Sequence, residues 1–245
     1  KVKAGIEQAS VVSASQSISI IATESMVNDA FVDSFAVALA VGANAVSASG
    51  AGVDIHSVVG ASVTAGIDGN STLHAIGGNV SVHADDTTDA TAEGLASSIS
   101  ASAGAFAGAV SVGVALSDVE VANTVLAEID NATITVDNGD LIVRATDNVT
   151  VNSSSEAAAI AAGFSLFSAS ISLSGGGAQA DAIVRGSTEA EIGNSTITLT
   201  EGTLSVDADQ DVTVNSTSGS LSIAGSLNSL AAGGSVANID ISPSI

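Results

Sequence analysis

The chain has 245 residues, of which 26 are Asp or Glu and only four are Lys or Arg, so its formal net charge is −22. Four basic residues cannot neutralise a row of phosphates, which excludes nucleic-acid binding. The absence of Cys excludes disulfide scaffolds and thiolate metal sites. Hydrophobic residues make up 46% of the chain but aromatic residues only 2%, so its core must be built from Ala, Val, Ile and Leu.

A repeat of about 62 residues runs through the sequence. Its clearest copies begin Ala127-Glu-Ile-Asp-Asn-Ala-Thr-Ile-Thr-Val and Ala190-Glu-Ile-Gly-Asn-Ser-Thr-Ile-Thr-Leu, and diverged copies begin at Ala4 and Ala65. A fixed period of this size is typical of repeat architectures. We therefore predict one continuous solenoid over residues 1–245, with repeats at approximately 1–61, 62–123, 124–186 and 187–245.

Within each repeat the side chains alternate with a period of two. Leu141, Val143 and Ala145 form one row, whereas Ile142 and Arg144 form the other. The equivalent apolar row of the last repeat contains Val206. This alternation predicts strands with one buried face, on which Val143 and Val206 point inward.

The rest of each repeat is a long run without charge. These runs are Gly94–Ser117, Ala157–Ala180 and Val212–Ile239. They are rich in Ser and Gly and lack flanking Lys or Arg, so we reject transmembrane helices. Alternating Ala and larger residues predict strands that are buried on one face and closely approached on the other, or that pack in a thin core. A helix at 156–162 stays open as an alternative, because Ala is the best helix former.

These features predict an all-β fold, a parallel β-solenoid (β-helix) built from four repeats. At roughly 20 residues per coil, each repeat would form about three coils. Twelve coils stacked at about 4.8 Å would make a rod on the order of 60 Å long. Two larger coils per repeat would fit the same sequence.

An amide side chain recurs shortly after the isoleucine near the start of each repeat. The four residues are Gln8, Asn70, Asn131 and Asn194. We expect them to form a longitudinal row at a corner of the solenoid, where they satisfy backbone groups of the turn. The alternative is that Asn simply favours turns.

The segment Val110–Ala145 resembles repeats of giant secreted bacterial adhesins, the leukotoxin-like and filamentous-haemagglutinin-like surface proteins. The likeness lies in an Ala/Gly/Val run followed by Asn-Thr-x-x-x-Ala-x-Ile-x-Asn-Ala-x-Ile-x-Val and Gly-Asp-Leu-x-Val-x-Ala. This resemblance implies a long, exported β-helical shaft on the cell surface or in the extracellular matrix. It carries no catalytic residues.

Calcium is the one cofactor candidate that the acidic residues raise. Asp207, Asp209 and Asp211 place three carboxylates at alternate positions, and Ca²⁺ prefers such oxygen ligands. The glycine that an EF-hand loop requires is missing, however, so a solvated acidic turn is the competing interpretation. Otherwise we expect no cofactor. The outward threonine pairs Thr133/Thr135 and Thr196/Thr198 raise ice binding, but Thr is favoured in strands in any case.

We therefore expect a structural protein and no enzyme: a repeat segment of an extracellular adhesin, stalk or matrix filament, bacterial and secreted. The alternative is a solenoid module that binds calcium, a carbohydrate or an ice surface. The expected partners are further repeats or identical subunits in end-to-end contact, and a cell-surface or matrix component. No nucleic acid and no membrane-spanning segment are expected.

Overall fold

The computed structural model describes residues 1–166 and 169–245 of the chain. Strands account for 84% of the residues and the described residues contain no helix, which confirms the all-β parallel solenoid. The region 156–162 is strand, so the alternative of a helix there is wrong. Within the part of the chain that is described, no helix is long and apolar enough to cross a membrane.

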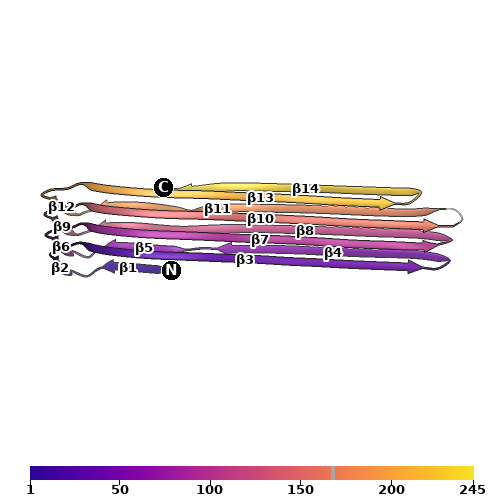
Figure 1. Ribbon diagram of the computed structural model, residues 1–245, viewed down its shortest axis with the longest axis horizontal. Coiled ribbons are helices and arrows are strands. Elements are labelled where there is room, and N and C mark those ends of the chain that lie inside the picture. The colour runs from indigo at the N-terminus through magenta and orange to yellow at the C-terminus, as the bar shows by residue number, and fades with distance from the viewer. Residues whose placement is uncertain (167–168) are drawn as a thin grey trace.

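Two long parallel sheets lie face to face along the molecule, and a third, short parallel sheet lies at one end (Figure 1). The front sheet consists of β13 (Leu204–Gly225), β10 (Leu141–Ser165), β7 (Val80–Gly104) and β3 (Ile18–Val41). The back sheet consists of β1 (Val2–Ile6), β5 (Ser62–Ile67), β8 (Phe106–Asp130), β11 (Ser170–Gly193) and β14 (Asn228–Ser244), with β4 (Asn44–Val59) also paired to β8. A small end sheet consists of β12 (Thr196–Leu199), β9 (Thr133–Val136), β6 (Thr72–Ala75) and β2 (Val11–Ala14).

Every strand pairs with its equivalent one repeat away. Val143, for example, lies beside Val82 on one side and Val206 on the other. Each repeat therefore forms one large coil with three sides, where the sequence analysis predicts about three smaller coils. The physical reason is that the alternation of β7 or β10 continues for 25 residues without a turn, so each strand spans about 80 Å. The molecule is consequently longest along its strands and not along the stack (Figure 1).

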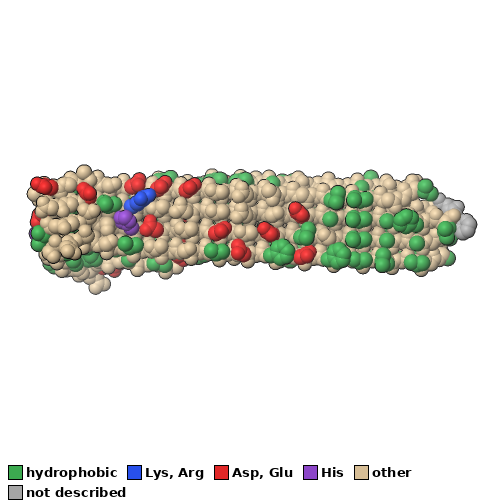
Figure 2. All heavy atoms as spheres, viewed as in Figure 1, with side chains coloured by type: hydrophobic (Ala, Val, Ile, Leu, Met, Phe, Trp, Pro, Cys, Tyr) green, Lys and Arg blue, Asp and Glu red, His purple; other side chains and the backbone are tan. Residues whose placement is uncertain are grey.

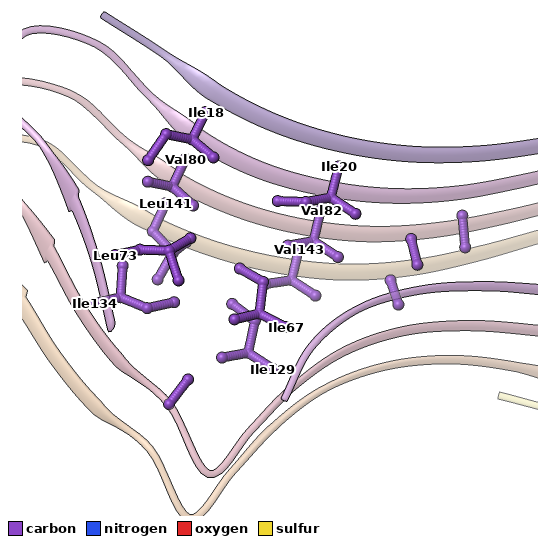
Figure 3. Packing of buried hydrophobic residues seen from close by; sticks show 14 of the residues in the cluster. Ile18, Ile20, Ile67, Leu73, Val80, Val82, Ile129, Ile134, Leu141 and Val143 are labelled. Atoms are coloured by element: carbon purple, nitrogen blue, oxygen red, sulfur yellow. The ribbon is translucent and has the colours of Figure 1, made fainter. Parts of the chain in front are cut away.

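At the end-sheet side the three sheets enclose the largest apolar side chains. Columns such as Ile18–Val80–Leu141 from the front sheet face Ile67 and Ile129 from the back sheet (Figure 3). Leu73 and Ile134 of the end sheet close the third side (Figure 3). Equivalent side chains stack in contact from coil to coil, so each repeat extends one continuous core.

Away from the end sheet the front and back sheets face each other directly, and the core side chains become smaller. The middle stretch is lined by Val and Ala, and the far stretch by Ala, Ser and Gly. Buried serines hydrogen-bond across this thin core: Ser47 to Ser100 at 2.7 Å, Ser98 to Ser111 at 2.6 Å, and Ser117 to Ser153 at 2.8 Å. Ser fits here because it is small, and in these three pairs its buried hydroxyl finds a partner in the opposite sheet.

Gly113 shows how closely the sheets approach. A Cβ atom at this position would lie 2.8 Å from the carbonyl oxygen of Ala158 and 3.3 Å from that of Ala96, both in the front sheet. The prediction of a thin core is correct, but the larger residues of these runs, such as Val112 and Val114, point outward and are exposed. The small side chains form the interior.

The predicted register of the apolar rows is correct. Val143 is fully buried, whereas Ile142 and Arg144 lie on the outer surface. Val206 points inward in the same column but is 45% exposed, because β13 has a neighbouring strand on one side only.

Replacing Val143 with Ser should lower the free energy of unfolding by about 2–4 kcal/mol, because it leaves a cavity and a buried hydroxyl. The matched variant Ile142→Ser changes the adjacent residue on the outer face and should cost less than about 1 kcal/mol. Urea denaturation of both variants measures the difference. A loss for Ile142→Ser as large as that for Val143→Ser would contradict the assignment of the inner and outer faces.

Gly113→Ala should destabilise the fold by about 1–3 kcal/mol, because the new methyl group would push the two sheets apart. Gly177 is the control: it lies on the outer face of β11, and nothing lies within 4 Å of a Cβ atom built there. Gly177→Ala should be neutral or slightly stabilising, because Ala loses less backbone entropy on folding. Thermal unfolding of the two variants tests the close approach of the sheets.

Candidate functional site

A column of polar side chains lies inside the solenoid, where the three-sided core narrows to two sheets. It is formed by equivalent residues of the front sheet: Glu24 on β3, Asp86 on β7, Asp147 on β10 and Gln210 on β13. Asp86 is 1% exposed and Asp147 is fully buried. Two buried carboxyl groups in adjacent strands need hydrogen-bond donors, because burying a charged group without partners is costly.

Asn123 of the back sheet supplies two of these donors, and Gln210 Nε2 donates to Asp147 Oδ2 at 2.9 Å. Asn123 Nδ2 donates to Asp86 Oδ2 at 2.8 Å and to Asp147 Oδ1 at 3.1 Å, and its Oδ1 accepts from the backbone N–H of Ala61 at 3.0 Å. Thr88 Oγ1 donates to Asp86 Oδ2 at 2.9 Å. Asn123 therefore ties the front sheet to the back sheet across the core.

The two buried aspartates lie so close together that protonation of Asp86 is favoured. Burial raises the pKa of Asp86 to about 6, and the nearby charge and carboxyl group of Asp147 act in the same direction. The hydrogen bond from Thr88 opposes this shift. A protonated carboxyl group can donate to its neighbour, which explains how two acids lie side by side in the core.

The three aspartates that were candidates for calcium do not converge. Asp207, Asp209 and Asp211 are exposed on the outer face of β13, at alternate positions about 6.7 Å apart along one strand. Arg144 lies between two of them, with Nε 3.8 Å from Asp207 Oδ2 and Nη2 3.7 Å from Asp209 Oδ2. Over residues 1–166 and 169–245, no group of three or more His, Cys, Asp or Glu side chains is arranged to hold a metal ion.

The four corner amides lie at the turn between the back sheet and the end sheet, one in each coil. Gln8, Asn70, Asn131 and Asn194 all have positive φ, between 41° and 62°, a conformation that Asn adopts more readily than most residues. Their amide groups do not form a ladder. Asn131 and Asn194 both donate to Asp130, at 2.7 and 3.1 Å, so the turn conformation is what these residues share.

The predicted outward threonines lie on the end sheet. Thr133 pairs with Thr72 and Thr196, but Val11 occupies the same column in the first coil. The next column reads Ser13, His74, Thr135 and Thr198. The threonine array is therefore interrupted in both columns.

One surface is absent from the sequence predictions. Beyond the last acidic residues, the outer faces of both long sheets carry exposed apolar side chains and no charge; Figure 2 shows this for the front sheet. On the front sheet they include Val37 and Ile223, and on the back sheet Val112 and Leu173. The uncharged runs of the sequence contain the residues of this surface. Both faces of these strands are apolar, however, so alternation alone does not say which face is buried and which is exposed.

Folding raises the pKa of Asp86 above its ordinary value of 3.8, so the folded state binds a proton that the unfolded state releases. The contribution of this group to stability is therefore complete below about pH 4 and is lost as the pH rises through about 6. Asp86→Asn should remove this part of the pH dependence, so that unfolding free energies measured in urea fall less between pH 4 and pH 7 than for the unmodified chain.

The control for this experiment is Asp85→Asn, which removes the same charge from the outer face of the same strand. It should leave the decline between pH 4 and pH 7 as steep as in the unmodified chain. If Asp86→Asn and the unmodified chain decline equally, the buried pair does not share a proton.

Comparison with protein-family models, with curated proteins and with solved structures found no match for this chain. The likeness to secreted adhesin repeats therefore stays an expectation from the quoted residues. The geometry of the coils is what supports a function.

Proposed function

We propose that the chain is a structural repeat segment of an extracellular adhesin, stalk or matrix filament and has no catalytic role. The observation that carries this proposal is the unbroken register between coils. β10 pairs with β7 over 25 consecutive residues and with β13 over 22, always between equivalent residues of successive repeats. Such a coil is a template on which a further copy of the same repeat fits.

The backbone of the outermost strands provides the means of extension. In β10 the inward residue Leu141 donates its N–H to the carbonyl oxygen of Thr203 in the next coil, at 2.9 Å. β13 pairs only with β10, so its other edge has no neighbouring strand, and we call this the open edge of the stack. By the same geometry, the inward residues of β13 direct their N–H and C=O groups to the open edge. Long, flat strand edges of this kind pair readily with another strand.

Stacking of this kind suits a stiff shaft. Each coil uses about 62 residues and adds about 4.8 Å of length, while the strands make the shaft about 80 Å wide. Each junction between coils is crossed by backbone hydrogen bonds along the whole strand. A long shaft with these dimensions requires a very long chain, which agrees with the resemblance to giant adhesins.

The surface charge supports an extracellular, secreted location for this shaft. The acidic side chains on the front face lie over the part nearer the end sheet, as far as Asp33, Glu93 and Glu156 (Figure 2). A net charge of −22 keeps a protein hydrated and resists nonspecific association. Salt at extracellular concentrations screens the mutual repulsion of these acids beyond about 8 Å.

Ala208→Pro tests the extension through the open edge. Ala208 is an inward residue of β13, so proline there removes an N–H from the open edge and leaves the hydrogen bonds to β10 in place. We expect the 245-residue chain to stack into ribbons at high concentration, and Ala208→Pro to shift this association to at least about tenfold higher concentration. Sedimentation and electron microscopy measure both.

Ala208→Ser is the matched control, since it keeps the N–H, and circular dichroism should show the same β-rich spectrum for all three proteins. In aligned ribbons the 4.8 Å spacing should run along the fibre axis. Compact monomers at every concentration, for the unmodified chain and for tandem copies of it, would contradict the proposal.

A further inference from the structure

The outer face of the front sheet carries an uncharged apolar surface over its far part, which we call the distal front face (Figure 2). Its residues are the outward side chains beyond Asp33 and Glu156: Phe35, Val37, Leu39, Val41, Ser97, Ile99, Ala101, Ala103, Ala158, Ile160, Ala162, Phe164, Leu221, Ile223 and Gly225. Exposed apolar patches of several hundred Å² mark interaction sites on soluble proteins.

This face has a regular relief. One column consists of β-branched residues in all four coils, because Val37, Ile99, Ile160 and Ile223 are paired in register. In the two central coils, the columns on either side contain only small residues, Ser97 and Ala158 on one side and Ala101 and Ala162 on the other. The column of Ile160 is therefore a ridge, and each flanking column is a shallow groove in the central coils.

We propose that the distal front face is the binding surface for the same face of a second copy of this chain. The two copies pack face to face, with the Ile160 ridge of each copy in the groove beside the ridge of the other. Identical flat sheets have the same spacing between strands and between columns, so every coil of one copy meets a coil of its partner. Interdigitated faces of this type form dry, closely packed contacts between sheets.

The size of the surface fits such a pair. Four columns about 6.7 Å apart and four strands about 4.8 Å apart cover about 500 Å² on each copy. Two copies together would bury about 1,000 Å², which is the lower limit for a specific interface. Because every further coil enlarges the surface in proportion, stacking and pairing of the shafts reinforce each other.

The distribution of charge selects the orientation of the two copies. The acidic residues of the front face, such as Asp85, Asp89 and Asp207, all lie on the end-sheet side of the distal front face. A parallel arrangement would bring these acids into contact, and like charges across an interface are costly. A two-fold axis along the stacking direction, between the columns of Ile160 and Ala162, places the distal front faces of the two copies on each other. The acidic parts of the two front faces then point in opposite directions. The interface is then isologous.

The interface is tested with two variants that carry the same substitution on opposite faces. Ile160→Asp places a carboxylate in the middle of the ridge, whereas Leu173→Asp places one on the outer face of the back sheet, where Leu173 is also exposed. Ile160→Asp should raise the dissociation constant of the lateral pair at least about tenfold. Leu173→Asp should change it less than about twofold. Sedimentation equilibrium in 0.15 M salt measures both.

Single cysteines determine the orientation, because the chain contains none. Oxidation of a mixture of Ile160→Cys and Ala162→Cys chains should give a disulfide-linked heterodimer, since the two-fold axis places these residues opposite each other. Ile142→Cys, at the acidic end of the same strand, should give no dimer, because the two-fold axis separates its two copies by about 125 Å.

Lateral pairing is wrong if Leu173→Asp weakens association as much as Ile160→Asp, or if neither does. Dimers linked through Ile142→Cys would overturn the two-fold arrangement. Ala208→Pro separates this inference from the proposed function, because it blocks stacking at the open edge and leaves the distal front face intact. In that variant the lateral dimer should persist.

Discussion

Backbone pairing between residues one repeat apart holds the four coils together, and the side-chain pattern of every coil follows from that pairing. Each residue lies directly beside its equivalent, so a column contains four versions of the same position. Inside the solenoid the columns must fit between two sheets, which is why Val82, Val143 and Val206 are alike. Outside, the columns are more variable, although the column of Val37, Ile99, Ile160 and Ile223 on the distal front face is β-branched in every coil.

The core side chains become smaller with distance from the end sheet, and this changes what stabilises the fold. Near the end sheet, burial of Ile, Leu and Val gives the usual hydrophobic stabilisation. In the far stretch, Ala, Ser and Gly bury little apolar area per residue, so stability there depends on hydrogen bonds along the strands and on close contact between the sheets. Serine bridges such as Ser98–Ser111 and the missing side chain of Gly113 allow that contact. Asn123 and the buried aspartates lie where one type of core gives way to the other.

The sequence was sufficient for the fold class, the repeat and the inward rows, because period-two alternation and a 62-residue period are both local signals. The coil size was missed because the lengths of β7 and β10 exceed those of ordinary strands, and nothing in a single repeat states how far a strand continues. The buried pair was missed for a related reason. Asp86 and Asp147 are 61 residues apart, and Asn123 reaches them from the opposite sheet, so only the register brings the three together. The opposite holds for the aspartates at 207, 209 and 211. They are close in sequence, but they point outward in a line along one strand and do not form a site.

The coil size is tested most directly by distances between spin labels on the outer face of the front sheet. Labels at Ser81 and Ile142, one repeat apart, should lie on adjacent strands and broaden each other's spectra strongly. Labels at Ser81 and Ala101, which lie on the same strand β7, should be about 66 Å apart in a pulsed dipolar experiment. A short distance between Ser81 and Ala101 would mean that coils contain about 20 residues and would contradict the one-coil repeat.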